Sequence, residues 1–120
     1  MYKEIKIGGE AVPMKATAAT PFYYKQIFRT DLMKVFSAAA KAQDDTEEAS
    51  SIISEHIPEL AYVMKCQGAG EDMTTRNLET YVEWLETLEP NDIILASQDI
   101  LMLYNGNKVT SAVPKKKAGR

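Results

Sequence analysis

The side chains best suited to chemistry are a single histidine, His56, and a single cysteine, Cys66. A thiol beside an imidazole can form an activated nucleophile. The two residues lie ten positions apart across Pro58, and we interpret His56 as a half-exposed helix residue and Cys66 as a small packing residue. A lone histidine and a lone cysteine also exclude a histidine metal site, an intramolecular disulfide and a zinc knuckle. The sequence therefore predicts no catalytic residue and no metal.

Two segments invite comparison with ligand-binding motifs, and both lack required residues. The Gly-Ala-Gly segment at 68–70 follows a predicted helix and has neither the third glycine nor the Lys-Ser/Thr pair of a phosphate loop. The acidic segment at 44–48 lacks the alternating spacing and central glycine of a calcium-binding loop, and its carboxylates suit the start of a helix. We expect no cofactor, no small-molecule substrate and no enzymatic activity.

Size and composition indicate one globular domain. The chain has 120 residues, of which 45% are hydrophobic and 26% charged, and its net charge is -3. That charge is too close to neutral for a domain-wide nucleic-acid surface. No apolar run approaches the length of a membrane span, and the N-terminus lacks the apolar stretch of a signal peptide. We expect a soluble, intracellular protein that binds no membrane.

The first 16 residues predict a β-hairpin. Ile5 and Ile7 alternate with charged residues, and Gly8-Gly9 suits a tight turn in which both residues need positive φ. Pro13 lacks a backbone donor, which places the second strand at an edge. A lone hairpin is marginal in water, so its apolar face must pack on helices or on a neighbouring chain.

Helical patterns follow up to residue 104. Thr20 and Pro21 predict an N-cap and a first helical residue of a helix from about residue 21 to 28. Helical spacing then continues from Leu32 to Ala39, so the two stretches form either one bent helix or two. The next helix begins near residue 45, and Pro58 must kink or divide it. Thr74 or Thr75 can cap the following helix, whose expected apolar face is made of these residues: Leu78, Tyr81, Val82 and Leu85.

The last helix, which ends at Tyr104, is apolar nearly all round, so it is either central to the core or part of a subunit contact. The periodic pattern stops after residue 107. We therefore predict a mainly α fold: one domain at 1–107, with an N-terminal hairpin (1–16) and four to six helices, followed by a flexible, disordered basic tail at 108–120.

Several segments carry a family resemblance. They are IGGEAVPMKATAATPFYYKQIFRTDL at 7–32, LAYVM at 60–64, YVEWLE at 81–86 and LEP at 88–90, before the apolar helix that ends in Tyr104. In this order they resemble the tail assembly chaperones of long-tailed bacteriophages and prophages of Gram-positive bacteria. The shared motifs are structural rather than catalytic.

The resemblance implies a largely helical protein that binds the tape measure protein, keeps it soluble and helps tail tube protein polymerise around it. Such a chaperone acts in the host cytoplasm and is absent from the mature virion. The family often produces a short form and a longer form made by programmed frameshifting. This chain resembles the short form, and its Lys115-Lys116-Lys117 run falls where A-rich codons would allow the slip.

A chaperone of this kind needs exposed apolar side chains, and self-association would extend its reach. The candidate partner-binding residues are Phe22, Tyr23, Tyr24, Leu95, Met102 and Leu103. We expect a homo-oligomer. The alternative is a small helical regulatory or nucleic-acid-binding protein that uses the basic tail, whose binding would fall steeply with salt.

Overall fold

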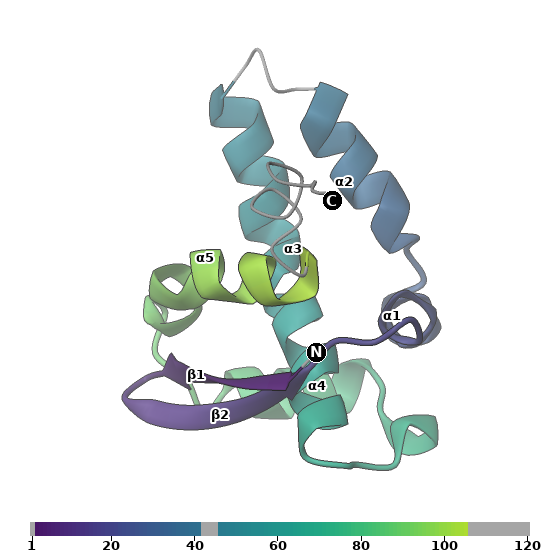
Figure 1. Ribbon diagram of the computed structural model, residues 1–120, viewed down its shortest axis with the longest axis vertical. Coiled ribbons are helices and arrows are strands. Elements are labelled where there is room, and N and C mark those ends of the chain that lie inside the picture. Colours follow the sequence, from purple (N-terminus) through teal and green to yellow (C-terminus); the bar gives the residue numbers. More distant parts are fainter. Residues whose placement is uncertain (1, 42–45, 106–120) are drawn as a thin grey trace, which may run out of the picture.

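The computed structural model describes residues 2–41 and 46–105. Its elements are β1 (Tyr2–Ile7), β2 (Glu10–Lys15), α1 (Thr20–Phe28), α2 (Leu32–Lys41), α3 (Thr46–Gly68), a 3-10 turn (Met73–Thr75), α4 (Leu78–Leu85) and α5 (Asp92–Asn105). The mainly helical class with an N-terminal hairpin is confirmed (Figure 1). The predicted basic tail at 108–120 lies outside the described residues.

The hairpin forms as its turn residues predict. β1 and β2 pair antiparallel, with Tyr2 opposite Lys15 and Ile7 opposite Glu10. Gly8 and Gly9 have φ values of 63° and 86°, as a tight turn compatible with strand twist requires. Ile5, Ile7 and Met14 face inward and are buried, whereas Glu4, Lys6 and Lys15 lie on the outer face and are exposed.

Residues 20–41 form two helices. Arg29 adopts a left-handed conformation with φ of 59° and ends α1, and its N–H donates to the Lys25 carbonyl at 2.8 Å. Asp31 then accepts a hydrogen bond from the Met33 N–H at 2.9 Å at the start of α2. A left-handed residue cannot continue a helix, so the chain turns between the two elements.

Thr20 is not the N-cap that the sequence predicts; α1 begins at Thr20 itself, after Ala19. The Thr20 side chain is fully buried and donates a hydrogen bond to Gln67 at the end of α3. It also accepts from the Thr17 N–H at 2.9 Å. The hydroxyl therefore joins two helices instead of capping one, because a buried hydroxyl must find partners inside the protein.

The central element is α3, a 23-residue helix that continues through Pro58 without being divided. Figure 1 shows α3 passing between α2 and α5 and reaching the hairpin. Leu60, Ala61, Tyr62, Val63 and Met64 are all buried. This stretch is covered on every side, so α3 is the central helix of the core. The sequence instead predicts that position, or a subunit contact, for the last helix.

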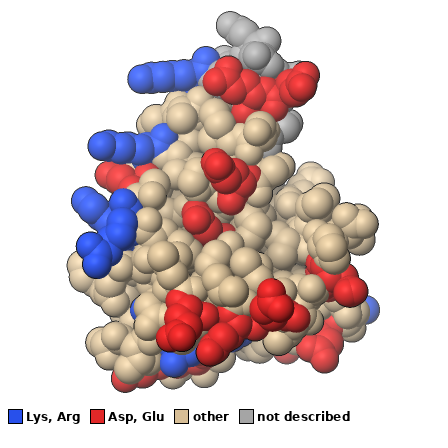
Figure 2. All heavy atoms as spheres, turned by 180° about the vertical axis from the view of Figure 1, so that it is seen from behind, with Lys and Arg blue, Asp and Glu red and all other residues tan. Residues whose placement is uncertain are grey.

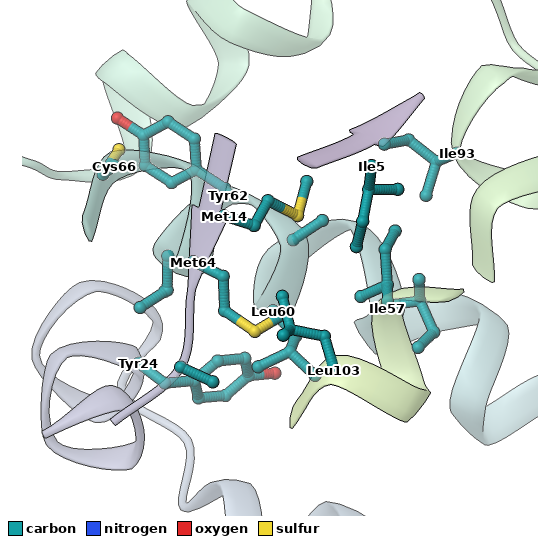
Figure 3. Close-up of a cluster of buried hydrophobic side chains, with 14 of the residues drawn as sticks. Ile5, Met14, Tyr24, Ile57, Leu60, Tyr62, Met64, Cys66, Ile93 and Leu103 are labelled. Atoms are coloured by element: carbon teal, nitrogen blue, oxygen red, sulfur yellow. The ribbon is translucent and has the colours of Figure 1, made fainter. Parts of the chain in front are cut away.

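The core joins residues distant in sequence. Figure 3 shows Ile5 and Met14 of the hairpin, Tyr24 of α1 and Ile93 of α5 gathered around buried side chains of α3. The hairpin also meets α3 through backbone, because a Cβ added at Gly68 would lie 2.6 Å from the Pro13 carbonyl carbon.

The start and the exposed face of α4 differ from the sequence prediction. Asn77 caps the helix in a reciprocal pair with Thr80, whereas Thr74 and Thr75 lie in the 3-10 turn capped by Asp72. Leu78 and Val82, expected to be buried, are 56% and 51% exposed.

The orientation of α4 is set by its aromatic and polar contacts. The Tyr81 ring packs on Phe28 with centroids 4.9 Å apart. The Tyr62 hydroxyl donates to Thr80 at 2.6 Å. These contacts turn the Tyr81 side of α4 toward the core and leave the Leu78 side outside.

Candidate interaction surface

The predicted partner-binding residues divide by exposure. Leu95 is 83% exposed, Phe22 67% and Met102 45%, whereas Tyr23 is half-buried. Tyr24 and Leu103 are 0% and 7% exposed. These last two residues are removed from the candidate surface, because they are already covered by the rest of the chain.

The burial of Tyr24 and Leu103 has a geometric cause. Tyr24 points from α1 toward α3, where its hydroxyl donates a hydrogen bond to Glu59. Leu103 lies three residues after Ile100, on the inner face of α5, and residues three or four apart share one side of a helix.

The outer face of α5 carries large apolar side chains. Ile94 is 64% exposed and precedes Leu95 in the sequence; Leu95 and Met102 are the two predicted partner residues that are exposed on this helix. Leu95, Gln98 and Met102 follow the spacing of one helical face. Adjacent exposed apolar side chains are typical of a surface that binds another protein.

A groove of about 400 Å³ lies beside this face, between α3 and the connection from α4 to α5. It is lined by Ser54, Pro58, Leu85, Leu88, Glu89, Pro90, Ile93, Ile94 and Ser97. Because Pro58 has no N–H, the Ser54 carbonyl cannot accept its usual helical hydrogen bond. Six of the nine lining residues are apolar, whereas Ser54, Glu89 and Ser97 are polar.

Charge is unevenly divided along the chain. Residues 46–105 hold twelve of the 17 acidic side chains and only two of the 14 basic ones, Lys65 and Arg76. Both cations bind Glu71, at 3.1 Å and 2.9 Å. Residues 2–41 instead hold seven basic and three acidic side chains.

The charges also separate in space. Figure 2 shows acidic side chains gathered along the lower edge, over α4 and its connection to α5. The basic side chains on this view lie mainly at the opposite side, over α1 and α2. The groove therefore opens on a negative part of the surface.

The sequence did not identify this groove. Its lining comes from α3, from the end of α4, from the following connection and from α5. Two local features of the sequence accompany the groove: the prolines Pro58 and Pro90, and the acids at 79, 83 and 86, which recur at helical spacing. Neither feature shows that α3 and the segment after α4 lie side by side.

A polar cluster joins α1 to α3. His56 Nδ1 lies 2.8 Å from Glu59 Oε1 and 3.1 Å from the Tyr24 hydroxyl, which itself donates to Glu59. Burial, with the bond to Glu59, raises the pKa of Tyr24 well above its usual range. The hydroxyl therefore stays protonated and acts as a donor that positions α1.

His56 and Cys66 do not form a nucleophilic pair. Both lie on the continuous helix α3, where ten residues span about 15 Å. Cys66 is fully buried, and burial raises the pKa of its thiol to about 11. A buried neutral thiol is a poor nucleophile.

Among residues 2–41 and 46–105, no three His, Cys, Asp or Glu side chains are grouped closely enough to hold a metal ion. None of the described helices has the length and apolar character needed to cross a membrane. No protein-family model matches the chain, and no significant match was found among curated proteins or solved structures.

Proposed function

We propose that this protein is a phage tail assembly chaperone that binds the tape measure protein, keeps it soluble and promotes polymerisation of tail tube protein around it. It acts in the host cytoplasm, is absent from the mature virion and associates with itself. The observation that carries the proposal is the outer face of α5, where Leu95 is 83% exposed and Met102 45%. The resemblance in the segments at 7–32 and 81–86 supplies the identity of the client.

The physical argument concerns a long helical client with apolar faces that have no partner before assembly. Leu95 and Met102 lie one on each side of Gln98, at helical spacing along α5. An amphipathic client helix can lay its apolar face along such a row. Binding of this kind depends on buried apolar area and therefore resists salt.

The test is co-expression with the tape measure protein of the same phage, followed by measurement of its soluble fraction and of co-purification. We expect wild-type protein to rescue the client, and Leu95→Asp and Met102→Asp to lose most of that rescue. Met33→Asp is the matched control, because Met33 is an apolar residue of α2, outside the α5 row, that is 60% exposed, and the substitution also adds a negative charge.

Two results would contradict the proposal. One is equal rescue by Leu95→Asp and wild-type protein. The other is retention that disappears at about 1 M salt, where charge interactions are screened within a few ångströms; that result would favour the regulatory or nucleic-acid-binding alternative.

The short-form assignment is a separate part of the proposal. Lys115, Lys116 and Lys117 lie outside the described residues, and their role concerns the gene. The coding sequence tests it: an A-rich heptamer at these codons and an overlapping downstream reading frame are expected. Their absence would remove frameshifting without affecting client binding.

A further inference from the structure

One exposed face of α1 combines an aromatic side chain with two cations. Phe22 is 67% exposed, and Lys25, Gln26 and Arg29 follow it at helical spacing. These four residues line a shallow hollow of about 410 Å³. Neither Lys25 nor Arg29 has an ion-pair partner within residues 2–41 and 46–105. Aromatic residues and arginine are the side chains that most often anchor protein interfaces.

The groove between α3 and α5 has the complementary character. Its apolar lining includes Leu85, Leu88, Pro90 and Ile94, and Glu89 lines it beside them. Glu86, one turn before Glu89, is also exposed. A phenyl ring suits such a lining, and carboxylates beside it suit a lysine or an arginine.

We propose that copies of this chain associate head to tail, with α1 of one copy seated in the groove between α3 and α5 of the next. Phe22 enters the apolar groove, and Lys25 and Arg29 face the carboxylates of Glu86 and Glu89. The inference rests on the self-association included in the proposed function and names its two contacting surfaces.

The two surfaces cannot satisfy each other within one copy. Figure 1 shows α1 on one side of α3 and the connection between α4 and α5 on the other. A two-fold symmetric contact could pair the basic surface with the acidic one only if both lay on the same face of the molecule, which they do not. Charge complementarity therefore favours two different surfaces meeting.

A contact between two different surfaces leaves one α1 surface and one groove free each time another copy is added. Such assembly continues until a ring closes or an open chain forms. Leu95 and Met102 lie outside the groove lining, so repeated addition would set the outer faces of α5 at regular intervals. A long client could then contact several copies at once.

The experiment is sedimentation analysis of the full chain over a range of concentrations at low salt. Wild-type protein is expected to form species larger than a dimer. Phe22→Asp breaks the α1 surface and leaves the groove intact, whereas Ile94→Glu does the reverse. Each variant alone is expected to be monomeric, with association at least about tenfold weaker than wild type.

Mixing the two variants gives the decisive result. The intact α1 of Ile94→Glu fits the intact groove of Phe22→Asp, and the remaining two surfaces are both broken. An equimolar mixture is therefore expected to form a one-to-one dimer and nothing larger. Met33→Asp is the matched control, because Met33 is a 60% exposed apolar residue on α2, and it should associate like wild type.

Three results would overturn the proposal. They are wild-type protein that stays monomeric at all concentrations, single variants that still form dimers, and a mixture that stays monomeric. Circular dichroism checks that each variant is folded. The pair Arg29→Glu and Glu89→Lys provides a second test, because each variant alone should weaken association and a mixture of the two should restore it. Client rescue is measured separately with Leu95→Asp, so failure of client binding and failure of self-association are distinguishable.

Discussion

The Thr20 hydroxyl donates a hydrogen bond to Gln67 Oε1 at 2.7 Å, which joins the first residue of α1 to the end of α3. Gln67 Nε2 donates to the Thr17 hydroxyl at 3.1 Å, and the Thr17 N–H donates back to Thr20 at 2.9 Å. The three residues form a closed ring of hydrogen bonds. This ring fixes where the chain enters the helical part of the fold after the hairpin.

Thr20→Val should lower the free energy of unfolding by about 2 kcal/mol, because it keeps the side-chain volume and leaves buried polar partners unsatisfied. Urea denaturation measures the effect. Thr87→Val is the control, since the exposed Thr87 hydroxyl bonds only to the nearby Trp84 carbonyl, and it should change stability by less than about 0.5 kcal/mol. Equal effects would show that the ring adds nothing.

Gly68→Ala should destabilise the protein by roughly 1–3 kcal/mol. Alanine is normally the better residue in a helix, but here its Cβ would lie 2.6 Å from the Pro13 carbonyl carbon and 2.9 Å from Met14 Cα. Gly70→Ala is the comparison: it has open space but φ of +69°, so it isolates the cost of backbone strain. Stabilisation by Gly68→Ala would contradict the close contact between α3 and β2.

Cys66 should react slowly with thiol reagents while the protein is folded. Burial raises its pKa from 9.0 to about 11, so at pH near 8 the thiolate is about a hundredfold scarcer, and the fully buried sulfur is also shielded. Reaction with Ellman's reagent should be at least about a hundredfold slower in buffer than in denaturing urea. Similar rates in both would contradict the burial of Cys66.

Stability should fall in alkaline solution. Burial, with a smaller contribution from the nearby Glu59, raises the pKa of Tyr81 from 10.0 to about 12. The unfolded chain therefore loses this proton first as pH rises through about 10, so the free energy of unfolding declines from there until about pH 12.

Urea midpoints between about pH 8 and pH 11 measure this decline, whose slope is at most about 1.4 kcal/mol per pH unit for each retained proton. Tyr81→Phe should make the decline shallower. Tyr2→Phe, at a tyrosine that is 62% exposed, should leave it unchanged. If the free energy of unfolding declines equally steeply with pH in both variants, Tyr81 does not cause the decline.

Much of the local structure follows from short-range rules in the sequence. Gly8 and Gly9 supply the two positive φ values of the turn, and Ile5 and Ile7 alternate with charged residues, so a hairpin with one apolar face results. Apolar spacing likewise predicts the helices around Leu60 and Ile100. These features depend on neighbours within a few residues.

The caps were harder to predict, because several polar residues compete near each helix start. Thr20 has the right residue type for an N-cap, yet its hydroxyl binds Gln67, 47 residues away. Asn77 caps α4 in place of Thr74 or Thr75. A distant partner or a better-placed neighbour decides which residue caps, and local spacing contains neither fact.

What the sequence by itself determined is the hairpin and the helical segments. Only the tertiary structure decided that Tyr24 and Leu103 are buried while Leu78 and Leu95 are exposed. Apolar residues occur on both faces of α5, so the local sequence does not show which face is buried. Which face is covered depends on the hairpin and α3, whose contacts with α5 come from segments far away along the chain.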